Sequence, residues 1–400
     1  MNNDSISWFT KSLAIYFLAL IIGAINVGSL GSLLKILGLI PIILWIFRYK
    51  GKLYLSPLFL SASLFLIWTA FSLLWSIDWT ATKTRAMTQL SFVLLLAATC
   101  TYNYNKREIK LLKTALIWSS RISVVVSLLF SSLLHGRLWL SGVINEDPNY
   151  LCMYFLFGIV NGVEVIFNEH GLLKKLIHIV EIFSYLYVII ATGSRGGALA
   201  AGATFAIVFF RVQKGKELGI RGIVGSIAFA TIAILGLVFA TNMVADDILG
   251  RFMIQDVIAS GGTGRALIWE DAWRTYINSN ILRKIVGYGT GTAKTIASEY
   301  HFRLINVIHN IYLENLLEVG IVGAILYIIY ILRFWNYARK NDTFCYSIIS
   351  GLMVMTLTVS AAAIKPYWNI LLFTICVSKY MMNAEKGDYH EKEGISYSSE

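Results

Sequence analysis

Charged residues are scarce in this chain of 400 residues, making up 14% of it, whereas a soluble domain carries about 25%. Hydrophobic residues make up 57%. Apolar runs of about 17 residues or more recur along the chain, and each approaches the roughly 20 residues that a helix needs to cross a bilayer. The shortage of charge therefore argues against a soluble domain and predicts an all-α, polytopic membrane protein.

Cysteine is also rare, with four residues in the chain, all in or beside apolar runs. No two have the spacing of zinc ligands, so the cysteines argue against both a zinc site and a disulfide framework. The first apolar run, 12–28, lacks a strongly basic start and an obvious small-x-small cleavage site, and a second run follows at once. We expect a retained helix here rather than a signal peptide.

Acidic residues are fewer than basic ones, which leaves a net charge of +11. Such a charge would suit a nucleic-acid partner, but its distribution does not. With the N-terminus inside, the predicted inner loops hold sixteen lysines and arginines and the short outer loops hold five. The positive-inside rule therefore predicts cytoplasmic termini, with membrane lipid and no nucleic acid as a partner.

The predicted organisation is one helical membrane domain over residues 1–382, followed by a disordered cytoplasmic tail at 383–400. About twelve transmembrane helices are expected, the eighth of them short for a bilayer. They cover residues 12–28, 31–47, 57–75, 87–103, 113–134, 150–167, 176–192, 197–210, 222–241, 307–332, 343–363 and 366–382. The polar stretch 242–306 then forms a long, partly helical outer loop between spans nine and ten, which is expected to act as a lid.

Two arginines stand at helix starts on the predicted outer face. Arg195 lies in the segment 192–197 (Thr-Gly-Ser-Arg-Gly-Gly), where glycines let backbone amides approach a phosphate and the guanidinium offers a planar fork of donors. Arg265 falls in the first turn of an amphipathic helix that also contains Trp269, near the positive end of the helix dipole. Both arginines suit an anion; a snorkelling or solvated arginine is the alternative for each.

His309 lies where the outer loop enters span ten. Nearby arginines would lower its pKa and keep the imidazole neutral, the form that accepts a proton from a hydroxyl. Glu318 follows at a depth where a carboxylate usually has a purpose or a partner, and we expect it to balance an arginine or to orient the histidine. A purely structural histidine at the helix start is the alternative.

Two weaker patterns lie in the same loop. The segment 287–291 (Gly-Tyr-Gly-Thr-Gly) resembles a nucleotide loop but lacks the strand–turn–helix context, so an anion-binding nest is the remaining function for it. Glu299, His301 and His309 are residue types that can bind a metal, but no metal site is expected from them.

Taken in order, these segments resemble the O-antigen ligase and polymerase family of bacterial envelope enzymes. The resemblance is strongest over about 185–330, and the segment 145–150 (Asn-Glu-Asp-Pro-Asn-Tyr) is also similar to the family. No single motif is specific, but three in order on one side of the membrane are fairly specific. The motifs are Ser194-Arg195-Gly196, then Gly264-Arg265 opening a helix with Trp269, then His309-Asn310-x-Tyr312-Leu313 running into Glu318-x-Gly320-x-x-Gly323.

The resemblance implies a metal-independent glycosyltransferase without a cofactor, in the bacterial inner membrane, with its active site facing the periplasm or exterior. The donor would be a glycan on undecaprenyl diphosphate, and the acceptor a hydroxyl of another glycan or of the lipid A core, in O-antigen, capsule or exopolysaccharide assembly. Arg195 and Arg265 would hold the diphosphate, His309 would activate the hydroxyl, and Glu318 would support them. The further expected substrate-binding residues are Trp269, Asn310, Tyr312 and Asn149.

Three alternatives to this interpretation stay open at the level of the sequence. A polymerase is favoured over a ligase, because a ligase requires an outer membrane that nothing in the sequence demonstrates. A flippase or other transporter of lipid-linked oligosaccharides would leave the loop 242–306 unexplained and predicts an internal symmetry that the sequence lacks. A non-catalytic scaffold is the third. Four charged residues within the predicted spans have no assigned role: Lys35, Arg121, Glu164 and Glu181.

Overall fold

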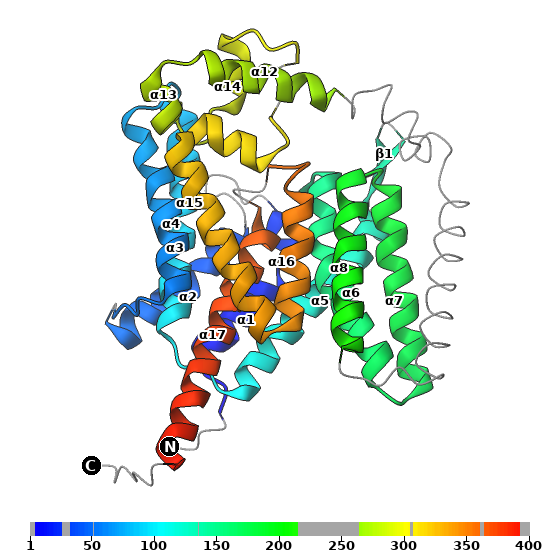
Figure 1. Cartoon of the computed structure of the whole chain (residues 1–400). Coiled ribbons are helices and arrows are strands. Elements are labelled where there is room, and N and C mark those ends of the chain that lie inside the picture. Colours follow the sequence, from blue (N-terminus) through cyan, green and yellow to red (C-terminus); the bar gives the residue numbers. More distant parts are fainter. Residues whose placement is uncertain are drawn as a thin grey trace.

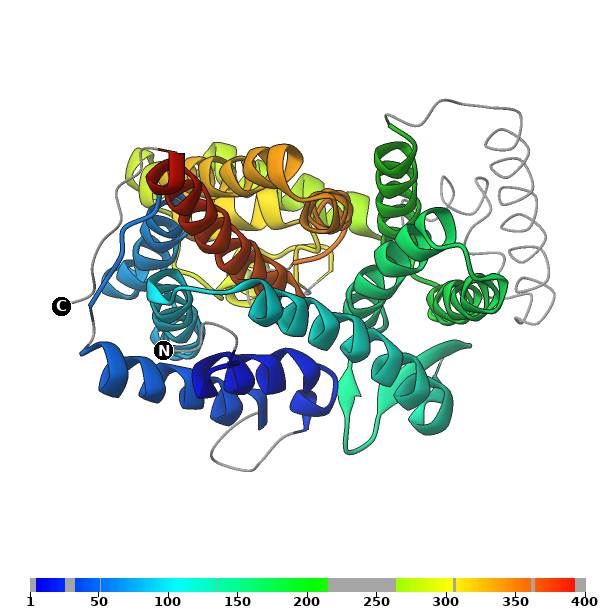
Figure 2. The same ribbon diagram turned by 90° about the horizontal axis from the view of Figure 1, so that it is seen from below.

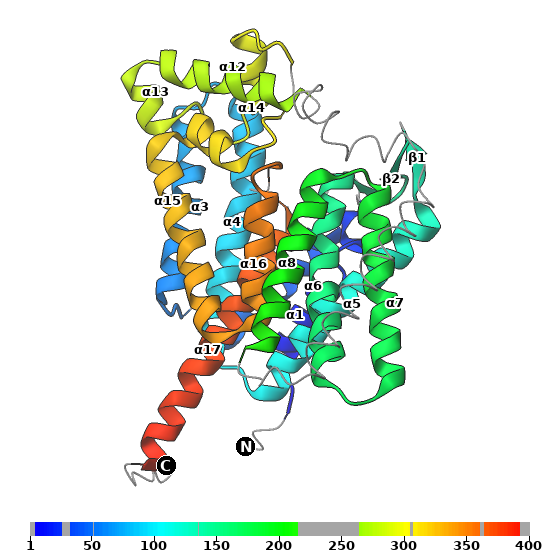
Figure 3. The same ribbon diagram turned by 45° about the vertical axis from the view of Figure 1, so that its right-hand side comes forward.

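The structure, a computed structural model, describes residues 5–25, 33–50, 52–134, 136–214, 264–304, 307–360 and 364–392. Its described part is a bundle of long helices with a layer of shorter helices, α12 to α14, across one end (Figure 1). The start of the first helix and the end of the last lie at the opposite end of the bundle, as a second view confirms (Figure 3).

Polar caps set the starts of the N-terminal helices. Asn105 and Glu108 form a capping box at the start of α5, and Asp78 accepts a hydrogen bond from the Ala81 amide at the start of α4. The helices of this part are α1 (Trp8–Leu18), η1 (Ile22–Ala24), α2 (Leu33–Tyr49), α3 (Pro57–Phe71), η3 (Ser72–Leu74), α4 (Trp79–Thr101) and α5 (Lys106–Phe130).

A small antiparallel sheet joins α5 to the next helix. Its strands are β1 (Ser132–Leu134), β2 (Arg137–Ser141) and β3 (Asn145–Glu146), in the order β1-β2-β3, with Leu134 opposite Arg137 and Leu140 opposite Glu146. The rest of the described chain is almost entirely helical, which is consistent with the predicted all-α membrane fold. The helices that follow are α6 (Pro148–Asn168), α7 (Leu172–Ala191) and α8 (Arg195–Gln213).

The C-terminal part begins with the outer layer and returns through the bundle. Its helices are α12 (Arg265–Asn278), α13 (Ile281–Val286), α14 (Ala293–Glu299), α15 (Ile311–Asn341), α16 (Thr343–Met355) and α17 (Lys365–Lys392). Viewed from below, α17 runs through the middle of the molecule, where it contacts α4, α5 and α16 (Figure 2). Residues 383–392, predicted as the start of a disordered tail, are the last turns of α17.

Eleven of the twelve predicted spans overlap helices in the described part of the chain, but twelve crossings are not confirmed. Among the described residues, five helical segments are long and apolar enough to cross a membrane: Pro57–Leu74, α5, α6, α8 and α15. The eighth span, predicted to be short at 197–210, is part of a helix of 19 residues. Span nine (222–241), loop residues 242–263 and tail residues 393–400 lie outside the described residues.

A kink in α15 fastens the outer layer to the bundle. Gly320 has φ 68°, a left-handed conformation that interrupts the helical ladder and frees nearby carbonyls. The Tyr288 amide donates to the Leu317 carbonyl at 3.0 Å, and the Gly289 amide donates to the Glu318 carbonyl at 2.7 Å. The carbonyls that the kink removes from the helix therefore bind the loop between α13 and α14.

Apolar packing completes this attachment. A small hydrophobic cluster unites α12, α14 and α15, and it is separate from the main core of the bundle. Its buried members are Ile268, Ala272, Tyr288, Ala293, Ile296, Ala297, Phe302, Ile308 and Leu317. Fully burying a leucine or isoleucine side chain contributes about 1.5–3 kcal/mol, so this outer-layer cluster gives α12 a fixed seat above α15.

Candidate active site

The turn that carries His309 is held on both sides. The Ile308 side chain is buried in the outer-layer cluster, and the Ile308 carbonyl accepts a hydrogen bond of 2.9 Å from the Trp269 indole. Beyond the histidine, the Asn310 side chain caps α15 and the Ile311 amide donates to the Thr356 carbonyl at 3.1 Å. His309 is therefore a fixed corner between the outer layer and the bundle.

The His309 backbone is strained at this corner. Its φ of 54° lies in the left-handed region, which costs a non-glycine residue about 1–3 kcal/mol. Such strain persists only where the surroundings hold it, and it is concentrated at functional sites. His301 shares the conformation, with φ 53°, but its side chain is exposed.

The His309 imidazole is held in its neutral form. Burial, and then the positive charge of Arg265, lower the pKa of His309 from 6.5 to about 4, whereas Asp147 acts in the opposite direction. Among the described residues, the Nδ1 atom is buried without a hydrogen-bond partner. At neutral pH the ring is therefore a free base under the electrostatic influence of a cation, Arg265.

Arg265 is the first residue of α12, as the sequence predicts for the start of the outer-loop helix. The preceding Gly264 has φ 80°, which turns the chain sharply into the helix. Farther along, Arg303 forms ion pairs of 2.7 Å with both Glu270 and Asp271, and these hold α12 against the segment that leads to His309. The half-buried Arg265 thus presents a guanidinium and a helix N-terminus at the same place.

Arg195 is the first residue of α8 and belongs to a tightly bonded turn. The Ser194 hydroxyl accepts a hydrogen bond from the Gly197 amide at 3.1 Å and donates to Asn149 Oδ1 at 3.0 Å. The Asn149 Nδ2 donates to Asp147 Oδ1 at 2.8 Å, and Asp147 is the carboxylate that acts on His309. Hydrogen bonds therefore link the Arg195 turn to the surroundings of His309.

The other predicted substrate-binding residues have structural contacts of their own. The Asn310 Oδ1 accepts from the Tyr312 and Leu313 amides, at 3.0 and 3.1 Å. The Tyr312 hydroxyl points to the Met353 carbonyl at 3.5 Å, and its ring packs edge-on against Tyr327. The Trp269 indole N–H donates to the Ile308 carbonyl, so all three of these side chains help to shape the turn that carries His309.

Glu318 and Glu314 form a second, deeper acidic group. The Glu318 carboxylate accepts from the Gly291 amide at 2.8 Å and the Ala293 amide at 3.0 Å. The nest proposed for 287–291 therefore binds the protein's own carboxylate. The Glu314 carboxylate accepts from the Ser360 hydroxyl, and Arg85 acts electrostatically on both glutamates.

Asp147 and Arg85 are site residues that the sequence reasoning missed. Asp147 stands inside the Asn-Glu-Asp-Pro-Asn-Tyr segment and is the N-cap of α6, so the Asp-Pro helix start was the available signal. Arg85 lies on α4 and lines an open groove of about 520 Å³. The groove residues are Asp78, Thr80, Ala81, Thr84, Arg85, Thr88 and Gly291, here called the α4 groove.

Possible metal ligands do not converge in the described part of the chain. No group of three or more histidine, cysteine, aspartate and glutamate side chains there has the geometry to hold an ion, and this includes Glu299, His301 and His309. The four cysteines are free and buried.

Comparisons with known proteins bear on the same segment. Residues 182–328, which contain Arg195, Arg265 and His309, match the family model described as O-antigen ligase. The chain is also similar to one chain of a solved structure described as "Structural coordination of polymerization and crosslinking by a peptidoglycan synthase complex", with 15% identity and a TM-score of 0.45, over 83% of this chain and 97% of that one. No match was found among the curated proteins.

Proposed function

We propose, from the premise that this chain is a member of the O-antigen ligase and polymerase family, that it transfers a glycan from undecaprenyl diphosphate to a hydroxyl acceptor. The reaction takes place at the outer leaflet of a bacterial inner membrane, with both termini cytoplasmic. The outer layer of α12 to α14 lies at the opposite end of the bundle from the termini, which supports that orientation (Figure 1).

One observation carries the proposal: a half-buried, neutral imidazole with a buried Nδ1 lies within the electrostatic reach of the Arg265 guanidinium. His309 accepts the proton of the acceptor hydroxyl as the oxygen bonds to the anomeric carbon of the donor. The bond between that carbon and the phosphate oxygen breaks, and the diphosphate leaves with its electron pair. Arg265 and Arg195 stabilise the negative charge that develops on the leaving group.

The surroundings suit this division of roles. Since Nδ1 of His309 is buried, Nε2 is the nitrogen that meets the acceptor. Because α12 is seated on the outer-layer cluster, Arg265 is positioned before substrate arrives, and little reorganisation is needed during the reaction. The Asn149–Ser194 hydrogen bond ties the Arg195 turn to the start of α6, where Asp147 interacts electrostatically with His309.

The test is glycan transfer by the reconstituted protein. The protein is supplied with an undecaprenyl-diphosphate glycan and an acceptor, and released undecaprenyl diphosphate is measured. We expect His309→Asn, which tolerates the left-handed backbone, and Arg265→Ala to reduce release by about 100-fold or more. Retained release in either variant would contradict the mechanism.

Two exposed residues provide matched controls. His301 has the same backbone conformation as His309, and Arg274 lies on the same helix as Arg265 in an exposed ion pair with Glu270. His301→Asn and Arg274→Ala should retain full release. Movement of the lipid across the membrane without cleavage would instead indicate a flippase.

We propose that the protein is a polymerase rather than a ligase. A polymerase lengthens a lipid-linked glycan in the absence of lipid A core, whereas a ligase needs the core as acceptor. Product length with each acceptor supplied alone separates the two.

A further inference from the structure

Of the four charged residues without an assigned role, three form ion pairs in the described part of the chain and one, Lys35, does not. Arg121 pairs with Glu181 at 2.8 Å, and Glu164 pairs with Lys113 at 2.8 Å. Lys35 forms no ion pair with any residue that the structure describes. Lys35 is the third residue of α2, so its exposed ammonium group lies near a helix end and is available to a ligand.

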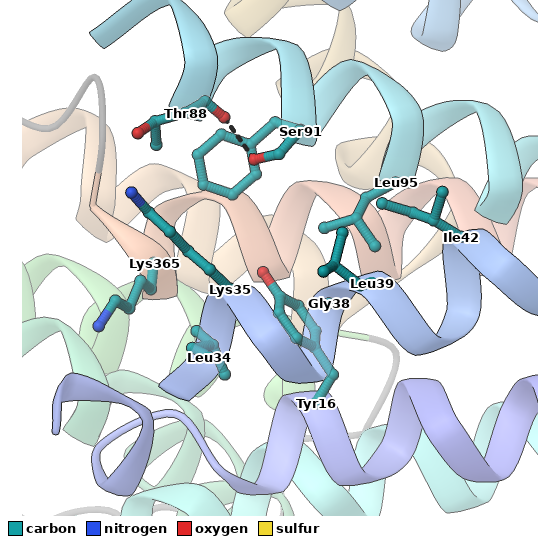
Figure 4. A pocket seen from close by; sticks show the side chains of 11 residues that line it. Tyr16, Leu34, Lys35, Gly38, Leu39, Ile42, Thr88, Ser91, Leu95 and Lys365 are labelled. Carbon is teal, nitrogen blue, oxygen red and sulfur yellow. Dashed lines mark hydrogen bonds between the residues drawn. The ribbon is translucent and has the colours of Figure 1, made fainter. Parts of the chain in front are cut away.

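Lys35 lines a pocket of about 210 Å³ between α1, α2, α4 and the start of α17 (Figure 4). The residues of this lysine pocket are Tyr16, Leu34, Lys35, Gly38, Leu39, Ile42, Thr88, Ser91, Phe92, Leu95 and Lys365. None of them is acidic. In Figure 4 the amino groups of Lys35 and Lys365 lie at one end, and Ile42 and Leu95 lie toward the other.

The charged end of the pocket suits an anion. The Lys365 Nζ donates to the Gly23 carbonyl at 3.1 Å, which fixes its position. The two ammonium groups repel each other, and the carboxylate that attracts Lys365, Glu146, also accepts a hydrogen bond of 2.7 Å from Tyr154. A phosphate between the lysines would relieve their repulsion and accept hydrogen bonds from both.

The rest of the pocket is lined mainly by apolar side chains, and one of them, Leu39, is exposed. Apolar side chains on the outer faces of α2 and α4 are exposed, as expected where a helix meets hydrocarbon: Leu39 and Ile43 on α2, Met87 and Leu90 on α4. A ligand that fills the pocket therefore has an anionic head and an apolar chain. The small volume accommodates one chain rather than the several acyl chains of lipid A.

We infer that the lysine pocket binds the diphosphate of the acceptor, a second glycan carried on undecaprenyl diphosphate. This inference rests on the proposed function and gives it a substrate. The donor diphosphate must lie at the reacting anomeric carbon, beside His309 and Arg265. The diphosphate of a lipid-linked acceptor is instead separated from the reacting hydroxyl by the acceptor glycan, and so needs a site of its own.

A route for that glycan runs along α4. Thr88 lines both the lysine pocket and the α4 groove, so the two spaces are neighbours on α4. The charge of Arg85, in the groove, interacts electrostatically with Glu314 and with Tyr150. Tyr150 interacts in the same way with Asp147. The acceptor glycan thus extends from the lysine pair past Arg85 toward His309.

The kinetic test uses one substrate that can act only as donor and one that can act only as acceptor. The donor has its acceptor hydroxyl methylated, and the acceptor carries a methylene group in place of its anomeric oxygen. We expect Lys35→Gln/Lys365→Gln to raise the acceptor KM by about 10- to 100-fold, the loss of two charge-assisted contacts, with the donor KM unchanged. With the same glycan lacking its lipid diphosphate, the variant and the wild type should be equal.

Matched variants separate charge from structure. Lys35→Arg/Lys365→Arg keeps both charges and should retain most acceptor affinity. Lys83→Gln removes an exposed lysine from α4, where it stacks on Trp79, and should have no effect. If the double variant fails to fold, Lys35→Gln alone should still raise the acceptor KM, because Lys35 is exposed and has no ion-pair partner in the described chain.

Binding decides the inference even if no transfer is seen. Native mass spectrometry should find two undecaprenyl diphosphate molecules on the wild type and one on the double lysine variant. A raised donor KM, an equal effect on the lipid-free acceptor, use of lipid A core only, or a single bound lipid on the wild type would each overturn the inference. If two lipids bind but no transfer occurs, the proposed function is wrong, whereas the lysine pocket is still a binding site for a lipid diphosphate.

Discussion

At His309, two effects act in the same direction on the imidazole. Burial is the larger, and the charge of Arg265 is the smaller, while Asp147 partly opposes them. The sequence predicts the neutral ring from nearby arginines alone, because a chain position does not reveal how much water surrounds a side chain. The proposed base therefore stays neutral mainly because its position between the outer layer and α15 shields it from water.

The pH profile of transfer tests this state. A base works only when unprotonated, so activity should be retained as pH falls from 8 to about 5 and then lost with a midpoint near the His309 pKa of about 4. A solvated histidine would lose activity near 6.5 instead. The measurement is kcat/KM for release of undecaprenyl diphosphate between pH 3.5 and 8.

Charge-neutralising variants should move that acid limb in opposite directions. Arg265→Gln removes a nearby cation, so the pKa of His309 should rise yet stay below 6.5, because burial remains. Asp147→Asn removes the carboxylate that favours the charged ring, so the pKa should fall further. Equal profiles for both variants would show that neither group acts on His309.

At the scale of elements, α15 joins the membrane bundle to the outer layer at its kink. A Cβ at Gly320 would overlap the backbone of Ile285 in α13, and the residue has a left-handed φ. The sequence places this glycine in a motif but cannot show that its role is to free carbonyls for residues 288 and 289. The contact is between segments far apart in the chain, and periodicity does not report it.

Gly320→Ala should loosen this joint. The left-handed backbone alone costs alanine about 1–3 kcal/mol, and the overlap with Ile285 adds to it. We expect a lower unfolding temperature in detergent and reduced transfer, since α12 carries Arg265. Gly202→Ala in α8, where no atom lies within 4 Å of the added methyl group, should be neutral or stabilising.

At the scale of the whole molecule, the sequence predicts where helices lie better than which of them cross the membrane. The α4 helix begins at Trp79, eight residues before the predicted span, and carries Lys83 and Arg85 beyond the apolar stretch. The helix α16 has 13 residues and begins where the predicted span of 21 residues begins, so it is much shorter than that span. A helix surrounded by other helices need not match the bilayer in length or be apolar along its whole surface.

The proposed orientation of the bundle makes the last prediction. Ala266 is exposed on α12 in the outer layer, and His170 is exposed in the turn between α6 and α7 at the end where the termini lie. In spheroplasts, a membrane-impermeant maleimide should label Ala266→Cys directly and His170→Cys only after permeabilisation. The native cysteines are buried and should give little background. The opposite pattern would put His309 and Arg265 on the cytoplasmic side, where a donor presented at the outer leaflet does not reach them.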